Sequence, residues 1–202
     1  MLFLLLTLLG LFALVLIYYN VLLPREIQPK RLDSWHFIYR EGNSAPRDMK
    51  DKYMELLATL SKEFDDLSSI TCAGIYFDSP AKLKHENEMR WAIGIKADEN
   101  NFESMKMKMG KHGFKHKLLP SVYCVANEVP YRNKLNFLLT KLYIGKLIDF
   151  LHKANIKREK DTLVEIMELN GKQPYIGFYC PFNKNADDYY ITSLKEPETL
   201  QE

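Results

Sequence analysis

The sequence has few of the residues that build most catalytic and metal sites. It contains only three cysteines, Cys72, Cys124 and Cys180, and they form no C-x-x-C pair. The five histidines, at positions 36, 85, 112, 116 and 152, have no spacing typical of metal ligands. The chain also lacks a glycine-rich phosphate loop, a nucleophile elbow and the spacing of a catalytic triad. We therefore predict no catalytic residue, no metal, no cofactor and a protein that is not an enzyme.

Two further absences concern the compartment and the partners of the chain. No N-x-S/T sequon occurs, and three cysteines cannot all pair with one another. In an oxidising lumen we would expect glycosylation sites or paired cysteines. With 28 basic and 26 acidic residues, the net charge of +2 creates no global field for nucleic acid. These features favour a cytosolic environment, with nucleic acid not expected as a partner.

One stretch is long, apolar and free of charge. Residues 2–23 contain no charged side chain, and a helix of this length reaches about 33 Å, against about 30 Å for the hydrocarbon of a bilayer. A cleavable signal peptide is the alternative, but the stretch lacks a basic start, a short core and an A-x-A-like cleavage site. We predict an uncleaved transmembrane anchor at 1–23.

The orientation of this anchor follows from the charges beside it. Arg25, Lys30 and Arg31 follow the apolar stretch closely, whereas the N-terminal side has only its amino group. Basic flanks stay in the cytosol, so the bulk of the chain should face the cytosol. A short linker at 24–31, with two prolines, should hold the next domain close to the membrane.

The remainder is patterned as two similar halves, which predicts an α+β domain at 32–182 and a loose polar tail at 183–202. Each half has the order βαββ, with helices against an antiparallel sheet. The first half has strand-like runs at 35–40, 71–77 and 90–96 and a helix at about 46–64. The second half has such runs at 121–129, 162–169 and 175–181 and a helical stretch at 131–155.

Two local features of the second half refine this prediction. The helical stretch is apolar on two opposite faces, which indicates a break near Gly145. Asn170-Gly171 predicts a hairpin turn between the last two strands.

Several strings support a resemblance when taken in order behind the apolar stretch. They are "GIYFDSP", "RWAIGI", "GFK", "VPY", "VEIM" and "YCPF". In this order the chain resembles the GyrI-like domain and, more closely, the testis-expressed protein 264 family of ER-phagy receptors. The resemblance implies a GyrI-like fold, a single-pass position in the endoplasmic reticulum membrane and recruitment of ubiquitin-like autophagy modifiers.

GyrI-like domains bind ligands in a groove between the two halves, and the resemblance places Glu165 there as the pocket acid. Strand alternation puts Glu165 on one face with Leu163 and Met167, an apolar setting in which an unpaired carboxylate is costly. A cationic or amphipathic ligand would supply the missing charge. Aromatic residues on the strands are candidates to line the site: Trp91, Tyr76, Tyr39 and Tyr123. The alternative is that Glu165 is structural, at a sheet edge or paired with an arginine such as Arg90.

Two other candidate sites concern the membrane and a protein partner. Residues 106–117 carry five lysines, two histidines and no acid, which predicts a solvated loop or a contact with anionic lipid headgroups. The lysines are Lys106, Lys108, Lys111, Lys115 and Lys117. In "FDDL", Phe64 and Leu67 have the spacing of an autophagy-modifier motif, and the competing interpretation is core packing.

These observations leave two functional hypotheses. The first is a membrane-anchored cytosolic adaptor of the endoplasmic reticulum that resembles an ER-phagy receptor. The alternative is a membrane-tethered protein that binds, or as a hydrolase acts on, cationic or amphipathic small molecules in the groove.

Overall fold

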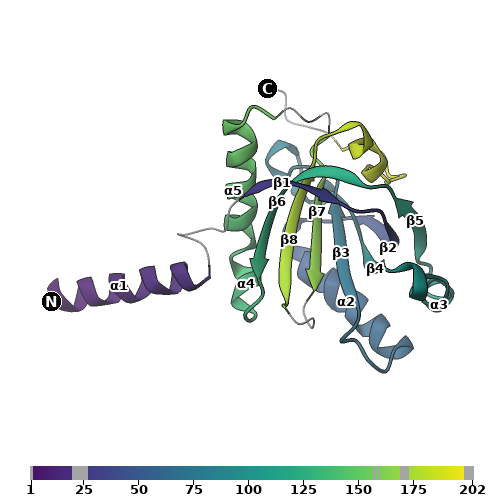
Figure 1. Cartoon of the computed structure of the whole chain (residues 1–202), viewed down its shortest axis with the longest axis horizontal. Coiled ribbons are helices and arrows are strands. Elements are labelled where there is room, and N and C mark those ends of the chain that lie inside the picture. Colours follow the sequence, from purple (N-terminus) through teal and green to yellow (C-terminus); the bar gives the residue numbers. More distant parts are fainter. Residues whose placement is uncertain (1, 20–26, 157, 159, 169–172, 198–202) are drawn as a thin grey trace.

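The fold is built around a single antiparallel sheet of eight strands, which curls so that its two edges lie near the same end of the domain (Figure 1). The computed structural model describes residues 2–19, 27–156, 158, 160–168 and 173–197. The strand order is β1-β6-β8-β7-β3-β4-β2-β5, and each pair of neighbours is antiparallel. The predicted class, α+β with an antiparallel sheet, is confirmed.

The elements have the following bounds. The strands are β1 (Gln28–Leu32), β2 (Trp35–Asn43), β3 (Thr71–Tyr76), β4 (Arg90–Ala97), β5 (Lys115–Leu119), β6 (Val122–Pro130), β7 (Leu163–Glu168) and β8 (Tyr175–Pro181). The α-helices are α1 (Leu2–Tyr18), α2 (Met49–Glu63), α3 (Glu99–Gly110), α4 (Leu135–Leu138) and α5 (Thr140–Lys153). Short 3-10 turns include η1 (Pro46–Asp48) and η4 (Lys184–Tyr189).

The two predicted βαββ units are present and meet at the middle of the sheet. The first unit is β2-α2-β3-β4, and the second is β6-α4-α5-β7-β8. Strand β3 of the first unit and strand β7 of the second are the two middle strands of the sheet, and they pair with each other. The turn predicted at Asn170-Gly171 lies outside the described residues.

Alternation along the strands gives the sheet two buried faces. One face packs against α2, α3 and α5, with Leu60, Met109 and Leu147 among its buried side chains. The other face packs against the C-terminal segment, with Phe37 and Tyr189 fully buried. The helices therefore cover one face of the sheet, as expected for an amphipathic α2 whose apolar positions recur every three to four residues.

Three elements were not predicted from the sequence. Residues 28–31, assigned to the linker, belong to strand β1, and the lysine-rich stretch 106–117 is the end of α3 followed by β5 rather than a solvated loop. Both added strands extend the sheet at its edges. Their short, charged sequences carry little apolar alternation, which is why the periodicity missed them.

The predicted break at Gly145 is wrong. Gly145 lies inside α5, and the break falls at Leu139, between α4 and α5. From there α5 buries Tyr143, Leu147 and Leu151 at a spacing of four residues. On the other apolar face of the stretch, Leu138 and Leu142 are exposed, whereas Leu139 packs against the core.

The start of the C-terminal tail is also more ordered than predicted. Tyr189 is fully buried and donates its hydroxyl hydrogen bond to the carbonyl of Pro120 at 3.0 Å. Ser193 donates from its backbone N–H to the carboxylate of Glu41 at 2.9 Å. A buried aromatic ring and specific hydrogen bonds hold the segment against the sheet, and composition alone does not reveal them.

The N-terminal helix α1 projects from the rest of the fold (Figure 1). Within the described ranges, no helix combines the length and the apolar character needed to cross a membrane. Residues 20–23 of the predicted anchor lie outside those ranges.

Candidate functional site

The candidate site centres on Glu165, in the middle of β7. Strand alternation directs Glu165 toward the helix-covered face, between Leu163 and Met167, as predicted. The residue is only 5% exposed. An acid therefore sits inside an apolar layer at the junction of the two repeats, since β7 pairs there with β3.

Two tyrosine hydroxyls hold the Glu165 carboxylate. Tyr76, on β3, donates to Oε2 at 2.6 Å, and Tyr53, on α2, donates to the same oxygen at 3.1 Å. The two hydroxyl oxygens are 3.4 Å apart. In the part of the chain that the structure describes, no hydrogen bond reaches Oε1. One carboxylate oxygen is thus bound twice, and the other has no donor in that part.

A glycine makes room for this arrangement. Gly74 lies opposite Glu165 in the β3–β7 register. A Cβ atom at Gly74 would lie 2.4 Å from the hydroxyl oxygen of Tyr53, closer than nonbonded atoms can approach. The absence of a side chain at Gly74 lets the Tyr53 hydroxyl pass over β3 to the acid on the neighbouring strand.

The electrostatics of the site favour the neutral acid. Burial raises the pKa of Glu165 above its ordinary value, although the hydrogen bonds from Tyr76 and Tyr53 act in the opposite direction. Burial and the nearby carboxyl also raise the pKa values of Tyr53 and Tyr76, so both hydroxyls stay protonated and can donate.

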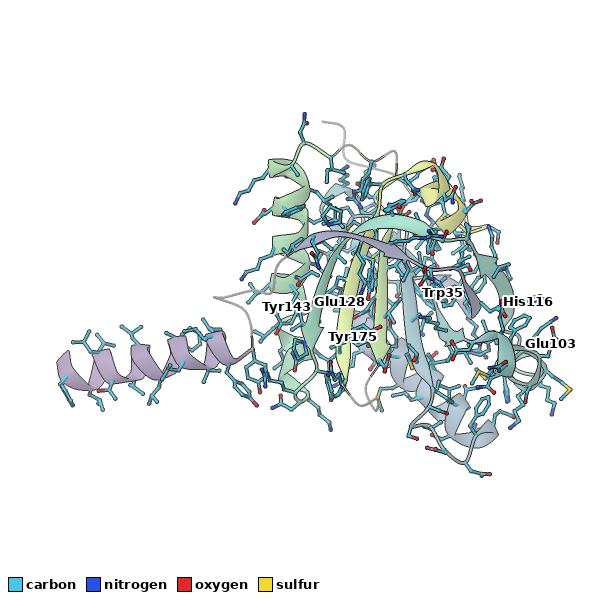
Figure 2. All side chains as sticks on the ribbon, viewed as in Figure 1. Trp35, Glu103, His116, Glu128, Tyr143 and Tyr175 are labelled. Atoms are coloured by element: carbon cyan, nitrogen blue, oxygen red, sulfur yellow. The ribbon has the colours of Figure 1, made fainter. Side chains whose placement is uncertain are left out.

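Among the described residues, no basic side chain forms an ion pair with Glu165. Arg90, the alternative partner considered from the sequence, instead pairs with Asp78 at 2.6 Å. Glu128, labelled in Figure 2, is an acid with a basic partner, because its carboxylate accepts hydrogen bonds from both Lys30 and Tyr179. Glu165 accepts from two tyrosines in the same way, but no cation among the described residues pairs with it.

The other ring candidates divide between the two faces of the sheet. Trp91 pairs with Tyr76 in register on the same face, but its indole N–H donates to Ser44 Oγ at 2.9 Å. Tyr39 points to the opposite face and stacks on Phe37, because β2 alternates the other way at that position. Tyr123 is more than half exposed on β6. Of the predicted rings, Tyr76 contacts Glu165, and Tyr39 lies on the wrong face.

The lysines proposed as a membrane surface mostly have partners within the fold. Lys115 forms an ion pair with Glu41, and the Nζ of Lys106 lies 3.5 Å from the Oε2 of Glu103. Lys108 donates to the carbonyl of Glu63 at 2.9 Å. Lys111 is exposed and Lys117 half-buried. Much of the local positive charge is therefore used within the fold.

The candidate partner motif lies just after α2. Phe64 caps that helix in an extended conformation, and the Nζ of Lys108 lies 4.5 Å from the centre of its ring. Phe64 and Leu67 are both half-buried against the helix-covered core. This placement agrees with core packing, and a role in partner binding stays a prediction.

A separate polar depression lies at one end of β3, β4 and β7. Its volume is about 280 Å³, and its lining does not include Glu165. The lining residues are Ser68, Ser69, Thr71, Lys96, Asp98, Asn101, Met105 and Glu168.

The comparisons with known proteins identify the fold. SAV2435 bound to tetraphenylphosphonium has a TM-score of 0.51 at 12% identity, covering 82% of this chain and 99% of that one. The EcmrR C-terminal domain has a TM-score of 0.50 at 10% sequence identity, and the match covers 79% of this chain and 98% of that domain. The fold is GyrI-like. Integron cassette protein VCH_CASS2, from the mobile metagenome of Vibrio cholerae, has a TM-score of 0.51 at 9% sequence identity. This match covers 79% of this chain and 97% of that one.

These identities establish a shared fold and nothing finer. No family model matches the chain, and no curated protein matches it. The GyrI-like part of the predicted resemblance is confirmed at the level of fold. The closer resemblance, to the ER-phagy receptor family, stays a prediction.

Sequence reasoning found the acid but missed two residues that shape its surroundings. Tyr53 lies among the apolar positions of the helix predicted at about 46–64, and it packs against the helix-covered core. A tyrosine at such a position needs a partner for its hydroxyl, and this was the available signal. Gly74 gave no signal, because its role depends on the approach of α2 to the sheet.

Proposed function

We propose that the chain binds cationic, amphipathic small molecules between its two repeats, with Glu165 as the anionic anchor. The observation that carries this proposal is a buried carboxylate bound by two tyrosines, with no basic partner among the described residues. Burying an ionised acid without a cation is costly, so burial raises the pKa of Glu165 and favours its neutral form in the absence of a ligand. A bound cation would supply the missing charge, and aromatic ring faces would add cation–π attraction. The tetraphenylphosphonium bound to SAV2435, which shares the fold, supports this class of ligand.

Access to the acid requires a local movement. Glu165 is 5% exposed, and Tyr53 reaches it from α2, so a ligand must displace Tyr53 or Tyr76 to touch the carboxylate. Tyr53 belongs to a helix that packs over the sheet, whereas Tyr76 is at the end of a central strand. We infer that α2 moves outward on binding while β3 and β7 stay in place.

Tetraphenylphosphonium should bind the full chain in non-ionic detergent, and Glu165→Gln should weaken the binding about tenfold or more. A tenfold change in affinity corresponds to about 1.4 kcal/mol of binding free energy, which is a modest contribution for a contact between two desolvated charges. The Gln side chain keeps the shape and removes the charge. Isothermal titration calorimetry measures both affinities.

The affinity of the unmodified chain for tetraphenylphosphonium should rise with pH. The cation binds the ionised carboxylate, and because the pKa of Glu165 is raised, more of this acid becomes ionised as the pH increases.

Glu168→Gln is the matched control. Glu168 lies on the same strand, beside the separate depression, so the variant removes the same charge without touching the site. Its affinity and pH profile should equal those of the unmodified chain. The proposal is wrong if both variants bind alike.

The same substitution makes a prediction about stability. Because the pKa of Glu165 is raised in the folded state, ionisation of this acid opposes folding at pH values above its pKa in the unfolded state. Glu165→Gln removes the ionisable group, so the variant should be no less stable than the unmodified chain at neutral pH.

We also infer that α1 inserts into a membrane. The observation that supports this second role is its apolar exposure on every side. Leu4, Leu5 and Leu6 follow one another and so point about 100° apart, yet they are 64%, 55% and 59% exposed. A protein groove would cover one side of such a helix, whereas lipid covers all of it. The flanking charges favour the cytosolic side for the domain that this helix carries, and the resemblance to ER-phagy receptors favours the endoplasmic reticulum as the membrane.

Protease added to intact vesicles from the endoplasmic reticulum should digest the sheet domain. The chain should also stay with the membrane after extraction at alkaline pH, because apolar insertion does not depend on charge. Release by alkali would contradict insertion of α1. Retention together with full protection from protease would instead contradict the cytosolic orientation alone.

A further inference from the structure

Three exposed apolar side chains lie close together in the sequence where α4 meets α5. Phe137, Leu138 and Leu142 are 40%, 77% and 48% exposed. They are the second apolar face of the helical stretch whose first face packs on the sheet through Tyr143 and Leu147. Phe137 packs its ring against Tyr131, with 5.6 Å between the ring centres. The proposed ligand site uses none of the three side chains.

This cluster lies beside the end of α1. Asn133 donates from Nδ2 to the hydroxyl of Tyr19 at 2.6 Å, and Tyr143 donates from its hydroxyl to the carbonyl of Tyr19 at 2.8 Å. Arg132 lies over the ring of Tyr18, with 4.1 Å from Cζ to the ring centre. Figure 2 shows Tyr143 on the side of the sheet domain that α1 approaches. The contacts fix the end of α1 against the segment that carries the exposed cluster.

The charged residues of the segment that carries the cluster are all basic from position 129 to position 148, before the acidic Asp149. Residues 129–148 contain no acid, and they include Arg132, Lys134, Lys141 and Lys146. Lys134 and Lys141 are exposed next to the apolar side chains. Apolar side chains flanked by lysines are the composition of segments that lie in the interface of an anionic membrane.

We propose that the surface formed by Phe137, Leu138, Leu142, Lys134 and Lys141 docks on the anionic leaflet of the membrane that holds α1. This second contact would set the orientation of the sheet domain, which a single helix cannot do. The proposal goes beyond ligand binding at Glu165, and it rests on insertion of α1 for its proximity to lipid. The lysine-rich stretch at the other edge of the sheet, by contrast, is largely paired within the fold.

Fluorescent labels on single added cysteines test the contact in the full chain, reconstituted into vesicles of phosphatidylcholine with phosphatidylserine. The probes are Leu138→Cys on α4, Met107→Cys on α3 as the matched exposed control, and Phe12→Cys on α1. The three native cysteines are buried, and burial raises the pKa of each thiol, to about 11 or 12, so labelling them should be slow. Labelling of the unmodified chain measures that background.

We expect the Leu138 label to be quenched by nitroxide lipids and several-fold less by aqueous iodide than the Met107 label. If the Phe12 label is inserted but the Leu138 label is as open to iodide as Met107, docking is wrong and insertion stands. If neither label meets lipid, both inferences fail. If the Leu138 label is shielded only when a soluble protein is added, the surface binds protein and the lipid proposal is overturned. Vesicles without phosphatidylserine should reduce shielding at Leu138 and leave Phe12 unchanged.

Discussion

Gly94→Ala should destabilise the sheet domain by about 4 kcal/mol or more, an exceptional loss for one methyl group. Gly94 pairs with Tyr39 in the β2–β4 ladder. A Cβ atom there would lie 1.8 Å from the carbonyl oxygen of Ile38 and 2.7 Å from the Cα of Tyr39. These are backbone atoms of the neighbouring strand, so no side chain can rotate away, and the strands must separate. Urea unfolding of the full chain in detergent, followed by tryptophan fluorescence, measures the loss.

Gly145→Ala is the matched control for this variant. Gly145 lies within α5, and a Cβ atom there would meet no atom within 4 Å. The same chemical change should stabilise the chain by about 0.5–1 kcal/mol, because glycine inside a helix costs conformational entropy. Equal effects of the two substitutions would contradict the close approach of β2 to Gly94.

The contrast between these glycines shows which parts of the fold the sequence could predict. The repeated βαββ order was read correctly, because buried strands and the α2 stripe are regular over many residues. Strands β1 and β5 were missed, since edge strands are short and charged and gain their order from pairing with the sheet. Gly145 suggested a break only because the exposed side chains at Leu138 and Leu142 were taken for core.

The candidate site was predicted in part for a similar reason. The alternation of β7 is a local property, and it placed Glu165 on the helix-covered face correctly. The partners of Glu165 depend on how α2 and β3 cross β7, which no local pattern encodes. Tyr39 was chosen because it lies on a strand, but alternation along β2 turns it to the other face, where it stacks on Phe37.

Arg90→Ala should destabilise the chain by about 3–5 kcal/mol, the range for removing one partner of a buried ion pair. Arg90 is buried and donates from Nε and Nη2 to the two carboxylate oxygens of Asp78, at 2.9 and 2.6 Å. It also donates to the carbonyl of Leu194 at 3.3 Å and to the hydroxyl of Tyr190. The variant leaves the Asp78 charge unpaired and frees the C-terminal segment. Urea unfolding measures the first effect, and faster proteolysis near Tyr190 reports the second.

Two further variants separate the role of Arg90 from charge in general and from the ligand site. Lys52→Ala removes one member of the exposed Lys52–Glu55 pair, at 2.8 Å, and should cost less than about 1 kcal/mol. Arg90→Lys keeps the charge but loses the two-pronged contact with Asp78, so it should lie between the other two variants in stability. Because Arg90 pairs with Asp78 and not with Glu165, folded Arg90→Lys should bind tetraphenylphosphonium as tightly as the unmodified chain. Tighter binding by this variant would mean that Arg90 competes with the ligand for Glu165, which is the arrangement that the Asp78 pair excludes.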